Sequence, residues 1–155
     1  MSDTHQANVD LMNQYAHALD TRDWVLFASL FTKDCEFAAR SWEENAVPGP
    51  WFMEVRTRDE LTATLQATWD GLSATHHFLS NYVVRPARDG KSAEASCYMR
   101  AHHVGNRERA HLFEESLGRF DLQTVKKKDG WKIARMEENI MVMLGTAEAF
   151  ANPVE

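Results

Sequence analysis

Apolar residues recur at spacings of three and four in the first half of the chain. This spacing predicts three helices, over about 7–19, 23–31 and 58–70. Asp20 or Thr21 is a candidate N-cap for the second helix, and Thr57 begins a capping sequence for the third. The first helix carries an apolar stripe formed by Val9, Leu11, Met12, Tyr15, Ala16 and Leu19.

Strand-like alternation dominates the second half. The pattern predicts a first strand over 34–40 and later strands over about 76–87, 92–104, 109–126 and 131–144. Asp89-Gly90 and Asp129-Gly130 supply hairpin turns, and Gly118 is the expected position of a bulge. Three helices before an antiparallel meander predict an α+β domain whose strongly curved sheet wraps around the helices. The open end of such a cone is the expected ligand pocket.

An aromatic segment interrupts this pattern at residues 41–56. It contains Trp42, Trp51 and Phe52 together with Pro48-Gly49-Pro50, so it is expected to be a loop. Apolar residues of this kind suit a lid that excludes water from a pocket. Residues 146–155 are expected to form a short tail.

Composition and charge narrow the class of protein. The 155 residues fit a single domain over 1–155, with 44% hydrophobic and 26% charged residues. The net charge is −6 and no basic stripe is present, which argues against nucleic-acid binding because phosphate recognition needs clustered Lys and Arg. The single basic run, Lys126-Lys127-Lys128, is expected to be a solvated turn.

The location of the protein is also constrained. The first residues are polar, unlike a signal peptide, and no apolar run is long enough to span a membrane. Cys35 and Cys97 have no CxxC partner, so two buried free thiols are favoured over a disulfide. These features predict a cytoplasmic protein that does not associate with membranes.

Asp20 and His77 are the main candidates for chemistry. Histidine titrates near neutral pH, and a carboxylate partner fixes its tautomer and raises its basicity. If the fold joins the two groups in a closed pocket, the protein has a general base and needs no metal or cofactor. Structural roles remain open for both: Asp20 as a helix cap, and His77 as a core histidine bonded to a carbonyl.

The paired histidines limit metal binding. His76 and His77 should face opposite sides of a strand, as should His102 and His103, because side chains alternate. A metal site formed by Asp20, His77 and His103 is conceivable, but the sequence lacks local ligand spacing such as HxxxH. The expectation is therefore no metal and no other cofactor.

Three segments carry a family resemblance: Tyr15 to Phe31, Thr75 to Asn81, and Asp129 to Arg135. On these residues the chain resembles the SnoaL-like polyketide cyclase and dehydratase family of the NTF2-like superfamily. The resemblance implies an α+β cone with Asp20 and His77 as catalytic residues and Tyr15 beside them. It also implies a basic residue of the last strand near Arg135. The second catalytic histidine of scytalone dehydratase has no clean match, since Ser96 or Cys97 falls near its position and His103 lies farther along.

The remaining candidates are substrate-binding residues. The Tyr15 hydroxyl is expected either to bond a substrate oxygen or to belong only to the packed helix stripe. Arg135 shares strand parity with apolar Ile133, so it is expected on the same face and needs an anionic partner there. The predicted substrate-binding set is Arg135, Trp42, Phe37, Tyr98 and His103, with core or interface packing as the alternative for the aromatic residues.

Two functions follow from these residues. The first is a cofactor-independent lyase or isomerase (a dehydratase, isomerase or cyclase) acting on a small apolar, carbonyl-bearing ring compound by Asp–His acid–base catalysis. The second is a non-catalytic subunit or ligand-binding module, similar to the β subunit of a ring-hydroxylating dioxygenase. The resemblance implies a homodimer or homotrimer in either case.

Overall fold

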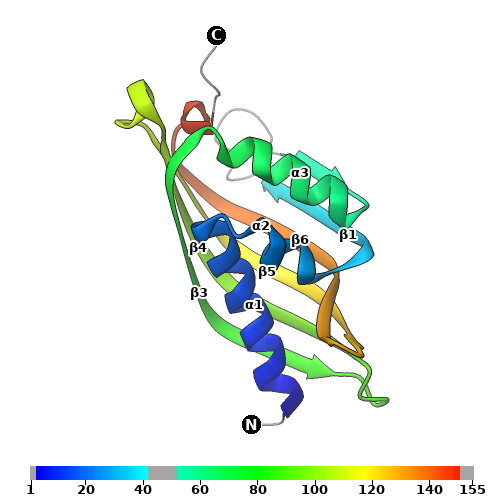
Figure 1. Cartoon of the computed structure of the whole chain (residues 1–155). Helices are drawn as coiled ribbons and strands as arrows, with labels where there is room; N and C mark the ends of the chain where they lie inside the picture. Colours follow the sequence, from blue (N-terminus) through cyan, green and yellow to red (C-terminus); the bar gives the residue numbers. More distant parts are fainter. Residues whose placement is uncertain (1–2, 42–51, 151–155) are drawn as a thin grey trace.

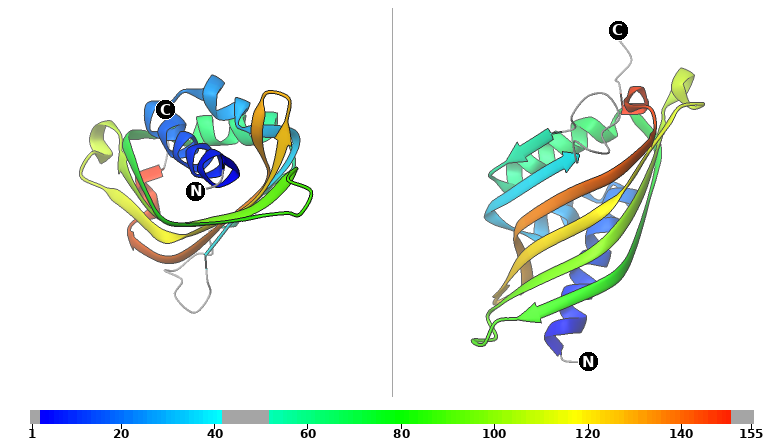
Figure 2. Two further views of the ribbon diagram at one scale, coloured as in Figure 1. Left: turned by 90° about the horizontal axis from the view of Figure 1, so that it is seen from below. Right: turned by 180° about the vertical axis from the view of Figure 1, so that it is seen from behind.

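A six-stranded mixed sheet encloses the helices in the computed structural model of the chain, which describes residues 3–41 and 52–150. The strand order is β2-β1-β6-β5-β4-β3; β1 and β6 pair in parallel and the other neighbours are antiparallel. The sheet curves strongly without closing, and the helices lie on its concave side (Figures 1 and 2). The predicted α+β cone is therefore confirmed.

The elements follow the predicted order. The helices are α1 (Asp3–Thr21), α2 (Trp24–Ser29) and α3 (Arg58–Trp69), with short 3-10 helices η2 (Arg107–Arg109) and η3 (Ala147–Phe150). The strands are β1 (Phe31–Ser41), β2 (Phe52–Val55), β3 (Leu72–Pro86), β4 (Ser92–Gly105), β5 (Phe113–Lys127) and β6 (Gly130–Gly145). No helix among the described residues is long and apolar enough to cross a membrane.

Some boundaries differ from the prediction. Phe31, expected at the end of the second helix, begins β1, because its side chain is buried in the core shared with the sheet. The short strand β2 begins at Phe52, within the segment expected to be a loop, and pairs with β1. The second helix is capped by Asp23, whose carboxylate accepts a hydrogen bond from the Leu26 backbone N–H at 2.9 Å. Neither Asp20 nor Thr21 is the cap, so Asp20 is available for another role.

A bulge does occur at the position of Gly118, but it lies on the partner strand β6 and not on β5 as expected. Leu117 pairs with Val142 whereas Gly118 pairs with Ile140, so Met141 is the extra residue on β6. A Cβ at Gly118 would lie 2.1 Å from the Asn139 carbonyl oxygen, so only glycine permits this approach of the two strands.

The core lies between the concave face and the helices. Phe120 and Leu122 of β5 point inward, in agreement with their alternation, and the buried thiols Cys35 and Cys97 are free. The large side chains with almost no solvent exposure include Phe27, Phe37, Phe120, Met12, Leu19, Leu61, Ile133 and Met136.

Candidate active site

Asp20 joins the end of α1 to β3. Its Oδ1 accepts a hydrogen bond from Thr75 Oγ1 at 2.9 Å and lies 2.7 Å from His77 Nδ1. Its Oδ2 accepts from the His77 backbone N–H at 2.9 Å. Three contacts to β3 hold the carboxylate in one orientation, and the two residues identified in the sequence are directly bonded.

His77 points into the cone and His76 points out. The His77 side chain is 4% exposed, whereas His76 is an exposed residue, in agreement with strand alternation. The His77 ring stacks on Trp69 at 6.3 Å between centroids. Because Asp20 accepts from Nδ1, the neutral ring carries its proton there and Nε2 keeps a free lone pair.

Burial and pairing act in opposite directions on this pair. Desolvation lowers the pKa of His77 and outweighs the hydrogen bond to Asp20, so the net shift is downward. For Asp20, burial alone raises the pKa, but the hydrogen bonds and charge interaction with His77, helped by Thr75, outweigh it and the net pKa is lowered. At neutral pH the arrangement is a neutral imidazole held by an ionised carboxylate, which is the form required of a general base.

A second histidine–carboxylate pair faces the first. His103 Nδ1 lies 2.7 Å from Glu114 Oε2, and Ser116 donates a hydrogen bond to Glu114 Oε1. The His103 and His77 rings are 5.5 Å apart between centroids and nearly perpendicular. The second histidine of the site is therefore His103, and neither Ser96 nor Cys97 takes that place. His77 pairs with Ala101 of β4, and His103 occupies the next inward position on that strand.

His77, His103, Glu114 and Ser116 line a cavity of about 50 Å³. No lysine or arginine is among its described lining residues, and most of its surface is apolar. The lining residues are Tyr15, Leu19, Phe37, Ala39, Met53, Leu65, Thr68, Trp69, His77, His103, Glu114, Ser116, Phe120, Glu138, Ile140, Met143 and Phe150.

Tyr15 lies where α1 meets the cavity. Its ring contacts Phe27 and Phe120, with centroids 5.6 and 5.5 Å away. Burial raises its pKa well above the usual value, and the nearby Glu138 and Cys97 add to the shift. The phenol is therefore neutral at physiological pH and able to donate a hydrogen bond into the cavity.

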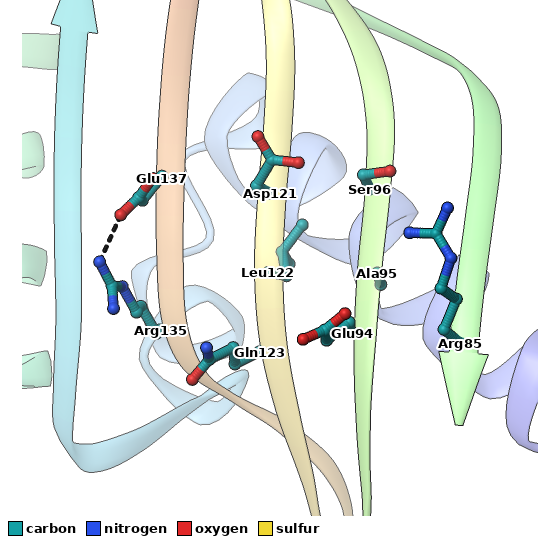
Figure 3. Close-up of a pocket in the computed structure, with 9 residues that line it drawn as sticks. All are labelled: Arg85, Glu94, Ala95, Ser96, Asp121, Leu122, Gln123, Arg135 and Glu137. Atoms are coloured by element: carbon teal, nitrogen blue, oxygen red, sulfur yellow. Dashed lines mark hydrogen bonds and ion pairs between the residues drawn. The ribbon is translucent and has the colours of Figure 1, made fainter. Parts of the chain in front are cut away.

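Arg135 does not reach this cavity. Its side chain is 44% exposed, and its guanidinium pairs with Glu137 at 2.5 Å on the outer face of the sheet, where both residues line a shallow groove (Figure 3). Strand parity predicted the wrong face because β6 contains a second bulge: Ile133 pairs with Thr124 but Arg135 pairs with Gln123, which leaves Ala134 as an extra residue. Side chains after Ala134 therefore face the side of the sheet opposite to the one that simple alternation predicts.

The other candidates divide between the two sides of the sheet. Phe37 and His103 line the cavity. Tyr98 is 53% exposed and points outward, because its neighbour Cys97 occupies the inward position. Trp42 and Trp51 lie outside the described residues, and so does most of the expected lid.

Most of the cavity residues were not among the candidates from sequence, and Glu114, Glu138 and Trp69 are three with polar groups. Alternation places Glu114 on the same face of its strand as Phe120 and Leu122, and a carboxylate among inward apolar positions is the signal that could have found it. Glu138 and Trp69 also line the cavity. Within 3–41 and 52–150, no group of three or more His, Cys, Asp or Glu side chains is arranged to hold a metal ion.

Comparisons with known proteins agree with this fold. One solved structure with a TM-score of 0.77, assigned as an aromatic ring hydroxylase from Novosphingobium aromaticivorans, is 23% identical and aligns over 95% of this chain and 96% of its own. A protein from the same organism assigned as a scytalone dehydratase has a TM-score of 0.75 and 23% identity, over 96% and 91% of the two chains.

A third relative represents a different function. The β subunit of an assigned aromatic-ring-hydroxylating dioxygenase, also from N. aromaticivorans, has a TM-score of 0.72 and 15% identity, over 97% of both chains. At these identities the likeness shows the fold alone. No curated protein matches the sequence. The profile of the SnoaL-like domain matches residues 3–137, and the chain therefore belongs to the SnoaL-like family.

Proposed function

We propose that the protein is a cofactor-independent lyase or isomerase acting on a small, uncharged, carbonyl-bearing ring compound. The observation that carries the proposal is the buried His77 at the wall of an apolar cavity, with its Nδ1 2.7 Å from Oδ1 of the partly buried Asp20. His77 removes a proton from the carbon next to the carbonyl through Nε2. Asp20 holds the ring and stabilises the imidazolium that forms.

The negative charge produced by this step needs a partner in the cavity. Tyr15 is a neutral donor among the lining residues and is assigned to the carbonyl oxygen, which becomes an enolate oxygen. A hydrogen bond that strengthens as the charge develops lowers the barrier by more than it tightens substrate binding. No lysine or arginine lines the described cavity wall, which favours a neutral substrate over a carboxylate or phosphate.

Substrate binding requires side chains to move. The cavity of about 50 Å³ is smaller than ligand pockets, which usually hold roughly 300–1,000 Å³. Met53 and Met143 belong to its wall, and unbranched methionine side chains change rotamer readily. Their reorientation, together with that of Phe150, is the proposed way in which a ring compound gains space.

The step that follows proton removal determines which type of enzyme the protein is. Loss of a hydroxyl from the β-carbon makes a dehydratase, return of the proton elsewhere makes an isomerase, and attack on a second carbonyl makes a cyclase. All three share the first proton removal. An assay of that step tests the proposal before the natural substrate is known.

The experiment is exchange of the α-hydrogens of cyclohexanone in D₂O, followed by proton NMR. We expect the wild-type chain to accelerate loss of the α-proton signal above the rate in matched buffer, because this exchange needs only a base and an oxyanion donor. Exchange no faster than in buffer, or no slower after removal of the His77 imidazole, would contradict the proposed base.

A second candidate function, a non-catalytic subunit, is favoured by the outer face of the sheet. An outer patch of exposed apolar side chains lies opposite the cavity: Phe78, Tyr98, Phe113, Val142 and Leu144. Large exposed apolar side chains gathered on one face of a protein often mark an interaction site. The ion pair between Arg100 and Glu115 lies among these strands and gives the face both signs of charge. We assign a second copy of this chain as the occupant, because a charge-balanced face is complementary to itself about a two-fold axis.

The oligomeric state tests this assignment. We expect the wild-type chain to show at least twice the monomer mass by light scattering, and the double change Phe78→Lys and Tyr98→Lys to yield a monomer that keeps its circular dichroism spectrum. Val25→Lys is the control, because Val25 is exposed on α2 away from the patch. A monomeric wild-type chain would exclude the assignment. A non-catalytic subunit further requires that the wild-type chain show no α-exchange above the rate in matched buffer.

A further inference from the structure

Glu138 carries a carboxyl of the cavity wall that the proposed base mechanism does not use. It lies on β6 between Phe120 of β5 and Ala39 of β1, and all three residues line the cavity. Met136 and Ile140, two residues to either side, are core residues. The inward direction of Glu138 is therefore set by strand alternation, as it is for its apolar neighbours.

The neighbours of Glu138 along the strand have partners on the outer face, whereas Glu138 points inward. Glu137 pairs with Arg135, and Asn139 donates a hydrogen bond to Asp121, both on the outer face. Among the described residues, no hydrogen bond or ion pair joins the Glu138 carboxyl to another side chain. A carboxyl that faces a cavity and is bonded to no cation or donor among the described residues is expected to hold its proton or to meet a ligand.

The charged and titratable groups around Glu138 favour its protonated form. Tyr15 faces it from α1, and Glu114 from β5 adds a negative charge. Desolvation, followed by this charge, raises the pKa of Glu138 to about 7. His77 from β3 and His103 from β4 line the same cavity, each bonded to its own carboxylate.

Resting on the proposed function, we propose that Glu138 is the catalytic acid that protonates the departing oxygen, which makes the reaction a dehydration. His77 takes the α-proton, and the electron pair of that C–H bond becomes the new C=C bond. The bond from the β-carbon to oxygen breaks towards oxygen, and the hydroxyl leaves as water with the proton of Glu138. The proton on His77 then returns to the Glu138 carboxylate through water, so substrate gives enone plus water with no redox change.

Two probes separate this role from a structural one. Both 3-hydroxycyclohexanone and 3-acetoxycyclohexanone eliminate to cyclohex-2-enone, which is followed by ultraviolet absorbance, but only hydroxide needs protonation in order to leave. We expect Glu138→Gln to reduce turnover of the hydroxy compound about 10²-fold or more, and that of the acetoxy compound less than about 10-fold. Glu137→Gln, the outward neighbour, is the matched control and should change neither.

The outcomes distinguish this inference from the function on which it rests. Equal losses on both probes, or none on either, would overturn the role of Glu138. If His77→Gln leaves the turnover of both probes unchanged, the role of His77 as the base is contradicted. A selective loss of hydroxy-compound turnover in Glu138→Gln would still support the role of Glu138 as the acid.

A readout without turnover uses ¹³C-labelled glutamate in the wild-type chain, with the Glu138 carboxyl resonance assigned by its absence in Glu138→Gln. An oxygen that accepts a hydrogen bond from protonated Glu138 stabilises the protonated carboxyl. Cyclohexane-1,3-diol has an oxygen at the β-position but no carbonyl to activate elimination, so it should raise the Glu138 titration midpoint. A midpoint that is unchanged or lower with saturating cyclohexane-1,3-diol overturns the proposal.

Discussion

Replacing His77 by glutamine is expected to reduce α-hydrogen exchange of cyclohexanone by about 10²–10⁴-fold, the contribution usual for a positioned general base. Glutamine keeps a polar side chain of similar length that can still bond Asp20, but it cannot accept a proton at neutral pH. The fold should therefore persist while the α-hydrogen exchange slows by this factor. The measurement is the initial exchange rate by NMR, together with the thermal unfolding midpoint of the variant.

His76→Gln is the matched control for this experiment. The two histidines are adjacent on β3, but His76 is exposed and His77 is buried at the cavity. A general effect of removing an imidazole from this strand would slow both variants. The proposal requires that His76→Gln retain wild-type exchange, and equal loss in the two variants would contradict it.

The pH dependence of the wild-type rate follows from the same pair. The pKa of His77 is lowered, so the imidazole stays neutral to a lower pH than a free histidine does. Exchange should fall only as the pH drops through that lowered pKa. This acidic limb should disappear from the residual activity of His77→Gln.

Replacing Glu138 by glutamine is expected to stabilise the protein at pH 8 by about 3 kcal/mol, and by much less at pH 5. The carboxyl has a pKa of about 7 in the folded chain against an ordinary 4.5, so the folded state binds its proton more tightly. The folded state therefore loses stability as the pH rises from the ordinary pKa to the raised one, by roughly 1.4 kcal/mol per pH unit. Glutamine has no charge to desolvate, and the penalty disappears.

Urea unfolding at pH 5 and pH 8 measures this effect. Glu137→Gln again serves as the control, because its carboxylate is paired on the outer face and its loss should change stability by less than about 1 kcal/mol. If Glu138→Gln has the same effect on stability at the two pH values, the carboxyl is ionised throughout, and the leaving-group role loses its proton source.

Periodicity along the chain was sufficient for the fold class. Three stretches of helical spacing, followed by long alternating strands, predict an α+β domain because each element must bury one face, and the family resemblance identified it as a cone. The close approach of two strands at Gly118 was also predictable, since glycine within a long strand marks such an approach. The short strand β2 escaped the pattern because four residues are too few to show a period.

The candidate site was only partly visible in the sequence. Asp20 and His77 were identified through a family resemblance, and the structure joins them by direct hydrogen bonds. Arg135 was misplaced because strand parity assumes an unbroken pairing register, and the extra residue Ala134 reverses it. A bulge without a glycine leaves no signal in the local sequence.

The sequence itself determined which residues share a face within an unbroken stretch of strand. Tertiary structure decided where bulges reverse that order and which faces meet: Asp20 reaches β3 across 57 positions, His103 meets Glu114 across the β4–β5 pair, and Glu138 lines the same cavity as His103. The reason is that local periodicity follows from the backbone geometry of each residue and its near neighbours. The charge and proton affinity of a buried group depend instead on what the whole fold places beside it and on how much water it excludes.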